Sequence, residues 1–186
     1  MEGVSLKSLR DRPFELLQEL ERRGRAMSAQ AGQEATAGRE WVGVALRMSG
    51  ELFLAAREET REVLSVPSSL TRVPGAKSWI RGLANVRGQL LPIIDLRQFI
   101  GSGVAPATRN TRIVVVNHRE IPAGLLVDEV LGFRRFAETE FSGDVPPTVA
   151  RCERYLAGAF RRGQEQWPVL SLRSILESPA FGEAAA

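Results

Sequence analysis

Few residues of this 186-residue chain could form or break bonds, because it contains one histidine and one cysteine. A Ser-His-Asp triad would need His118, which lies between Asn117 and Arg119 at the tip of a predicted hairpin, where water is seldom excluded. Asp128 and Glu129 are adjacent on a predicted strand edge, so their carboxylates point to opposite faces and cannot share a proton. The sequence therefore predicts no active site.

Metal and cofactor sites are equally unsupported by the sequence. One Cys and one His cannot form a zinc cluster of Cys and His ligands, and the single Cys152 excludes an internal disulfide. Neither G-x-x-x-x-G-K-[ST] nor G-x-G-x-x-G is present to hold phosphates. Asp95 follows an apolar strand and is expected to cap a helical turn at 96–100. We expect no metal and no cofactor.

The distribution of charge argues against nucleic-acid binding. The chain has 25 basic and 22 acidic residues, and the excess falls within 41–105, without a long basic run and with a single tyrosine. Nucleic-acid binders usually present a denser basic stripe with stacking aromatics. No apolar run approaches the roughly 18 residues that a membrane span needs, and the first 13 residues lack a signal-peptide core. These features favour a soluble cytoplasmic protein without membrane insertion.

The elements that position these residues change in character near residue 40. Residues 11–23 predict an amphipathic helix with Phe14, Leu17 and Leu20 on one face, which either packs on its own core or docks a partner. Residues 24–39 read as a linker. Beyond them the apolar period is two. It predicts strands at 41–48, 52–56, 63–66, 83–86, 90–94, 113–116, 123–127, 130–133, 156–160 and 169–172, with helical turns at 96–100 and 171–176.

Three short motifs recur in the same order. Residues 92–97 (PIIDLR) recur 76 positions later as PVLSLR, and 61–64 (REVL) recur 67 positions later as DEVL. Arg87-Gly88-Gln89 recurs 75 positions later as Arg162-Gly163-Gln164, which implies one inserted residue in the second loop. We interpret 41–105 and 106–177 as two copies of a small all-β unit of about five strands, followed by a tail at 178–186.

The turn Asn85-Val86-Arg87-Gly88 is the most distinctive surface feature of this scaffold. Arg87 carries five fixed donors, and Gly88 permits positive φ. Two interpretations stay open: a partner-binding turn, or a turn with a solvated arginine that is ion-paired to Glu62.

Two segments resemble the CheW family. Residues 74–101 (PGAKSWIRGLANVRGQLLPIIDLRQFIG) are similar to its central signature, and residues 123–130 (AGLLVDEV) to its second signature. Val86, where Leu is usual, and Ala123, where Val is common, are mild departures. The resemblance covers about 41–177.

The resemblance implies two SH3-like five-stranded β-barrels around a shared core, in a non-catalytic scaffold. Such a scaffold couples the cytoplasmic tips of chemoreceptors to a CheA-type histidine kinase, whose regulatory domain pairs with it barrel to barrel. It also implies a receptor groove formed by Glu62, Gly82, Asn85, Val86, Arg87 and Gly88.

Residues 1–40 extend beyond a minimal member of the family. The helix PFELLQEL and the following Trp41 resemble adaptors of chemosensory systems that control type IV pili and twitching motility. This implies a cytoplasmic protein recruited to membrane-associated receptor arrays. The alternatives are a flagellar chemotaxis adaptor and a small-molecule sensor that uses the cleft between the barrels.

Overall fold

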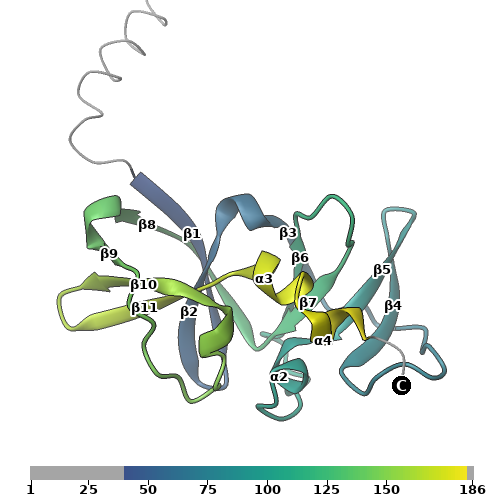
Figure 1. Ribbon diagram of the computed structural model, residues 1–186. Helices are drawn as coiled ribbons and strands as arrows, with labels where there is room; N and C mark the ends of the chain where they lie inside the picture. The colour runs from purple at the N-terminus through teal and green to yellow at the C-terminus, as the bar shows by residue number, and fades with distance from the viewer. Residues whose placement is uncertain (1–39, 184–186) are drawn as a thin grey trace, which may run out of the picture. The chain divides into compact units, whose positions relative to one another are not determined.

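The computed structural model describes residues 40–183, which form two β-sheets and several short helices (Figure 1). The helix expected at 11–23 and the linker at 24–39 lie outside the described residues. The strands are β1 Glu40–Met48, β2 Glu51–Ala56, β3 Thr60–Ser65, β4 Ile80–Val86, β5 Gln89–Asp95, β6 Arg112–Val116, β7 Gly124–Val127, β8 Glu129–Ala137, β9 Phe141–Ser142, β10 Leu156–Arg162 and β11 Glu165–Leu170. The helices are η2 Arg57–Glu59, α2 Leu96–Phe99, η3 Glu138–Glu140, η4 Glu153–Tyr155, α3 Leu172–Leu176 and α4 Pro179–Gly182.

The six-stranded sheet has the order β8-β1-β2-β11-β10-β9, and the five-stranded sheet has the order β3-β6-β7-β5-β4. Neighbouring strands are antiparallel except for β2–β11 and β5–β7, which are parallel. The predicted all-β class with few helical turns is confirmed. The two predicted five-stranded barrels correspond to two open sheets of six and five strands: one sheet has a sixth, two-residue strand, and neither sheet pairs its two end strands within residues 40–183.

Each sheet combines strands from both halves of the chain. The six-stranded sheet takes β1 and β2 from the first half and β8–β11 from the second, whereas the five-stranded sheet takes β3–β5 from the first half and β6 and β7 from the second. The chain passes between the sheets at η2, and the two sheets lie side by side in Figure 1. A boundary near residue 105 therefore does not separate them.

Strand register shows that the chain is duplicated. Val63 of β3 pairs with Val114 of β6, and Phe133 of β8 pairs with Val44 of β1. Phe133 thus corresponds to Val63, and Val114 to Val44, in both cases 70 positions later (133 minus 63; 114 minus 44). The same offset relates β1–β3 to β6–β8.

The last two strands of each copy are related by 76 positions. Gly82 and Gly158 have φ of 142° and 140°, and each lies at a register irregularity of its hairpin. The match of PIIDLR to PVLSLR has this offset and is confirmed. The match of Arg87 to Arg162 does not, because Arg87 is a turn residue whereas Arg162 ends β10 opposite Glu165. Both hairpins have two-residue turns, so the inserted residue does not exist.

The recurrence of REVL as DEVL also has the wrong offset. Glu62 pairs with Val115 and Gly132 pairs with Ala45, so Gly132, rather than Glu129, corresponds to Glu62. The duplication is correct, but only one of the three letter matches relates equivalent positions.

The largest apolar core is shared by the two sheets. It contains Leu46 and Phe53 from the six-stranded sheet, Val114 and Leu125 from the five-stranded sheet, and Ile175 from α3. Each of these side chains is fully buried, and burial of a Leu or Phe side chain contributes about 1.5–3 kcal/mol. The predicted shared core is confirmed, and it fixes the position of one sheet against the other.

Polar caps end the strands where the sequence predicts helical turns. Asp95 is fully buried and accepts hydrogen bonds from the backbone N–H of Gln98 at 3.1 Å and of Ala105 at 3.0 Å. Ser171 caps α3 in the same way, accepting from Ser174 at 3.1 Å. The predicted capping role of Asp95 is confirmed.

Candidate functional site

The turn between β4 and β5 holds an arginine in the open. Arg87 and Gly88 occupy its two central positions with φ of 51° and 83°, the combination that two-residue hairpins of type I′ require. The Asn85 side chain accepts a hydrogen bond from the backbone N–H of Gly88 at 2.9 Å and stabilises the turn. The Arg87 side chain is 80% exposed. The turn therefore presents a guanidinium to solvent.

Arg87 reaches across the open side of the five-stranded sheet. Its Nη2 lies 2.9 Å from Oε2 of Glu62, a residue of β3 at the opposite edge of the sheet. The two residues and Val86 line a hollow of about 150 Å3. Leu90, in the same hairpin, is 67% exposed. The ion pair predicted between Arg87 and Glu62 is present, and Val86 and Leu91 line the same hollow.

Glu62 also borders a larger groove. This groove of about 490 Å3 is lined by β3 residues, among them Val63, and by Phe133 of β8. Phe133 is 63% exposed, although its neighbours in the sequence led us to expect an ordinary strand residue. Each sheet, with the segments packed on it, forms one lobe of the protein. Because β3 and β8 belong to different sheets, the groove lies between the two lobes, and Glu62 borders it. Its aromatic wall was missed at the sequence level. The available signal was a phenylalanine followed directly by Arg134 and Arg135.

Gly82 does not lie on this exposed surface. It is buried, and a Cβ atom there would lie 2.5 Å from the carbonyl oxygen of Thr71. Thr71 forms a two-hydrogen-bond bridge with Leu83 along the edge of β4. Of the six predicted residues, the structure thus brings Glu62, Val86 and Arg87 together, sets Asn85 and Gly88 in the supporting turn, and separates Gly82 from them.

A second arginine, Arg162, spans the six-stranded sheet, and its Nε and Nη2 are both engaged in hydrogen bonds. Arg162 of β10 donates from Nε and Nη2 to the two carboxylate oxygens of Glu140, at 2.8 Å each, and from Nη2 to the Arg135 carbonyl at 2.8 Å. Its guanidinium also lies 4.4 Å from the centre of the Phe136 ring. These hydrogen bonds, with one from the Ala137 N–H, lower the pKa of Glu140 to about 2. Among the described residues, Arg87 has only the single contact with Glu62, so most of its donors can serve a partner.

The residues weighed for catalysis have structural partners. Nδ1 of His118 accepts from the backbone N–H groups of Glu120 and Ile121, and its Nε2 lies 3.3 Å from the Glu177 carboxylate. The side chain is 14% exposed, so the prediction of an exposed turn residue is wrong: the ring is enclosed by its own hairpin and the segment after α3. It serves to hold the hairpin in place.

The acidic pair points in two directions. Asp128 accepts from the Ser49 N–H at 2.9 Å and pairs with Arg97 at 3.2 Å. Glu129 pairs with Arg47 at 3.1 Å. The two carboxylates therefore serve separate contacts, as the sequence predicts.

Burial raises the pKa of the Cys152 thiol, which favours its neutral form.

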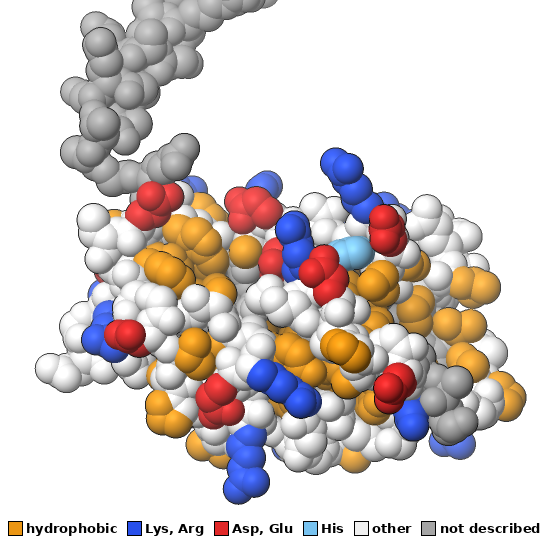
Figure 2. Space-filling model, viewed as in Figure 1, with side chains coloured by type: hydrophobic (Ala, Val, Ile, Leu, Met, Phe, Trp, Pro, Cys, Tyr) orange, Lys and Arg blue, Asp and Glu red, His pale blue; other side chains and the backbone are white. Residues whose placement is uncertain are grey.

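The surface charges are mixed. On the face shown in Figure 2, acidic and basic side chains lie among apolar ones without forming a continuous basic stripe. Within residues 40–183, no helix is both long and apolar enough to cross a membrane. The geometry describes an exposed arginine paired with a carboxylate, with Val86 in the hollow beside them and Phe133 in the adjoining groove.

The chain is similar in sequence to known proteins. The CheW-like domain family matches residues 43–180. Protein PilI of Pseudomonas aeruginosa is 38% identical over 173 residues, which are 93% of this chain and 96% of that protein. The chemotaxis protein CheW of Bacillus subtilis is 42% identical over 59 residues, which are 32% of this chain and 38% of that protein.

A solved structure supports the fold. The scaffolding protein TtCheW from Thermoanaerobacter tengcongensis superposes with a TM-score of 0.65 at 24% identity, and the match covers 76% of this chain and 91% of that one. At this level of identity the match establishes the fold.

Proposed function

Because the chain belongs to the CheW-like domain family, whose members are non-catalytic scaffolds, we propose that it couples a chemoreceptor tip to a CheA-type histidine kinase in the control of type IV pili and twitching motility. The observation that carries this proposal is the similarity to PilI, at 38% identity over 93% of the chain. The flagellar alternative has weaker support, since the similarity to the Bacillus subtilis CheW covers 32% of the chain.

The receptor surface that we propose centres on Arg87 and Glu62. Arg87 is exposed and has donors to spare, and the 2.9 Å pair with Glu62 fixes its side chain without enclosing it. Val86 lines the hollow beside the pair, and exposed Phe133 lines the groove that Glu62 also borders, so both offer apolar area to a helical hairpin tip. A tip that packs on these side chains would exchange part of the Arg87–Glu62 contact for hydrogen bonds with its own polar groups.

The remaining predicted residues act through the turn. Asn85 and Gly88 hold its conformation through the 2.9 Å hydrogen bond and the positive φ, and Val86 supplies apolar contact. For Gly82 we propose an indirect role, in which it admits Thr71 to the edge of β4. In this proposal Glu62, Val86 and Arg87 contact the receptor. Asn85, Gly88 and Gly82 support the conformation of the hairpin that presents them.

The kinase regulatory domain would bind elsewhere, on the lobe built around the six-stranded sheet. Both partners could then be held at once, so that movement of the receptor tip changes the geometry of the kinase. The protein would work in the cytoplasm at membrane-associated receptor arrays. No bond is made or broken in this mechanism.

Reconstitution tests the proposal. The full chain is mixed with a receptor cytoplasmic tip and a kinase regulatory domain, singly and together, taken from the pilus system and, in parallel, from the flagellar system of the same organism. We expect binary complexes with each pilus partner and a ternary complex with both. Selective binding of the flagellar partners would refute the pathway assignment, and failure to bind any receptor tip or kinase domain would refute the adaptor role.

A further inference from the structure

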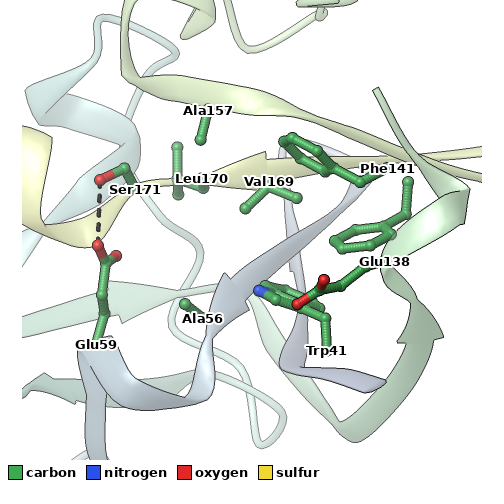
Figure 3. A pocket seen from close by; sticks show the side chains of 10 residues that line it. Trp41, Ala56, Glu59, Glu138, Phe141, Ala157, Val169, Leu170 and Ser171 are labelled. Atoms are coloured by element: carbon green, nitrogen blue, oxygen red, sulfur yellow. Dashed lines mark hydrogen bonds between the residues drawn. The ribbon is translucent and has the colours of Figure 1, made fainter. Parts of the chain in front are cut away.

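A second pocket lies in the six-stranded lobe, away from Arg87 (Figure 3). Its volume is about 450 Å3, which lies in the range of ligand sites. Trp41, Phe141 and Phe160 form an aromatic wall, with ring centres 4.6 Å apart for Trp41–Phe160 and 5.1 Å apart for Phe141–Phe160. Ala56 and Val169 supply apolar surface beside them. Aromatic and small aliphatic side chains around one cavity favour an apolar occupant.

The duplication identifies the corresponding place in the other lobe. Val169 and Ser171, which line the pocket, correspond at the 76-residue offset to Ile93 and Asp95. The parallel pairs Val169–Leu54 and Ile93–Gly124 confirm that these strands are equivalent.

In the five-stranded lobe this place is filled by a peptide segment. Ala105, from the loop before β6, is 5% exposed and packs in one cluster with Ile93 and Leu126. Its backbone N–H donates to the Asp95 carboxylate at 3.0 Å. At the 70-residue offset Leu126 corresponds to Ala56 of the pocket, a much smaller side chain. In the five-stranded lobe, this place therefore holds a segment of the chain through the Ala105 side chain and the Ala105 backbone N–H.

The charges at the pocket narrow the choice of occupant. Glu59 and Glu138 are the charged residues of its lining, and both are acidic. Glu59 is engaged with α3, because it accepts from the backbone N–H of Leu172 at 2.6 Å and contacts Ser171 Oγ at 3.3 Å (dashed in Figure 3). Glu138 is exposed, and its carboxylate forms no hydrogen bond or ion pair with the side chains or backbone of residues 40–183. Its carboxylate complements a basic group on the occupant.

We propose that this pocket binds a short extended peptide of a partner protein, which inserts a small apolar side chain beside the aromatic wall and presents a basic residue to Glu138. The Ser171 hydroxyl accepts from the Ser174 N–H and donates to Glu59, so its oxygen has one acceptor position left for a backbone N–H of that peptide, where the other lobe uses the Asp95 carboxylate. The proposal does not depend on the receptor surface at Arg87, which lies on the other sheet.

The probe is a synthetic peptide with the sequence of residues 102–109, SGVAPATR, which contains the alanine and an arginine four residues later. Binding to the full chain is measured by calorimetry and by tryptophan fluorescence, since Trp41 lines the pocket. Ala157→Phe should block the rim and weaken binding at least about tenfold. Ala157 is exposed and corresponds to Arg81, so the fold accepts a large residue at this position.

Glu138→Lys should weaken binding by about three- to tenfold, an effect that falls with added salt. Ala157→Ser and Arg87→Ala are the controls and should bind the peptide as the unmodified chain does. Absence of binding, or binding that Ala157→Phe leaves unchanged, would overturn the proposal. A dimer of the full chain in light scattering that Ala157→Phe dissociates would also overturn it, by assigning the pocket to a second copy.

Discussion

Replacement of Arg87 by alanine separates a binding role from a structural one. The Arg87 side chain is 80% exposed and its contact with Glu62 is a single 2.9 Å pair. Exposed ion pairs contribute about 0–1 kcal/mol, because water screens the charges and both side chains lose rotamer freedom. For a domain of this size, a loss of 1 kcal/mol lowers Tm by about 2–4 °C. We expect Arg87→Ala to remain folded within that margin.

The effect on receptor binding should be much larger. In a complex, the guanidinium would form charge-assisted hydrogen bonds from which water is excluded, and such a bond contributes about 1.5–3 kcal/mol. Since 1.4 kcal/mol is a tenfold change, the dissociation constant for a receptor tip should rise about ten- to hundredfold. Most of the change should appear in the dissociation rate.

The assay measures the affinity for a receptor cytoplasmic tip by calorimetry and Tm by scanning calorimetry on the same samples. Arg119→Ala is the matched control, because Arg119 is also exposed in a hairpin connection, between β6 and β7, and its loss removes the same charge. Affinity that is equal in Arg87→Ala and Arg119→Ala would refute the role of Arg87. A fall in Tm well beyond about 4 °C would refute the reasoning that the pair is structurally minor.

Three further predictions concern the fold. Gly82→Ala should destabilise the domain by about 1–3 kcal/mol in urea unfolding, since its φ is 142° and the new methyl would meet the Thr71 carbonyl at 2.5 Å; unchanged stability would contradict this. Leu125→Asp should abolish folding by burying an unpaired charge in the shared core, and a soluble variant with native circular dichroism would disprove the placement of β7. The folded pKa of Glu140 is lowered from 4.5 to about 2, chiefly by the Arg162 hydrogen bond, so its stabilisation is complete above about pH 4.5 and disappears as pH falls toward 2. Glu140→Gln should therefore lose less stability than the unmodified chain between about pH 6 and pH 3, and equal losses would count against that contact.

Local sequence patterns predicted most of the secondary structure. Alternation along 41–48 and 52–56 predicted β1 and β2 to within a residue or two, because one face of each strand must be buried. Asp95 was recognisable as a cap, because an acidic residue after an apolar run satisfies the free N–H groups of the helical turn that follows. Both inferences rest on contacts within a few residues, which a single sequence contains.

The pairing of strands could not be predicted in the same way. Strands β1 and β2 share a sheet with β8–β11, whereas β3–β5 share a sheet with β6 and β7. This pairing depends on hydrogen bonds between segments far apart in the chain. Every strand edge offers the same backbone N–H and C=O groups, so the sequence does not show which strand pairs with which. Short letter matches were a poor guide to equivalence. The recurrence of Arg-Gly-Gln, and of Arg-Glu-Val-Leu as Asp-Glu-Val-Leu, does not relate equivalent positions. The positive φ angles that Gly82 and Gly158 share do relate equivalent positions, but they can be read only from the structure.

The candidate site was predictable where it is polar. The Arg87–Glu62 pair was part of one of the two interpretations that the sequence left open, and it is present. Phe133 was not predictable, because an aromatic residue on a strand is usually core, and its exposure depends on where β8 ends up as the edge of its sheet. Edge position is a property of the whole topology.

The duplicated architecture gives a physical reason for where binding capacity lies. The two copies must both bury their strands, so equivalent core positions such as Leu125 and Ala55 remain apolar. They diverge at the sheet edges and lobe ends, where packing constrains them less. One sheet is spanned by Arg162, with Nε and Nη2 engaged, and the other by Arg87, which lies at a different position of its hairpin and is 80% exposed. The lobe ends are equivalent places: one is filled by Ala105, and the other is a pocket with an acidic rim. There, one copy shows the packing that the fold can hold, and the surface that the other copy leaves accessible is available to a partner.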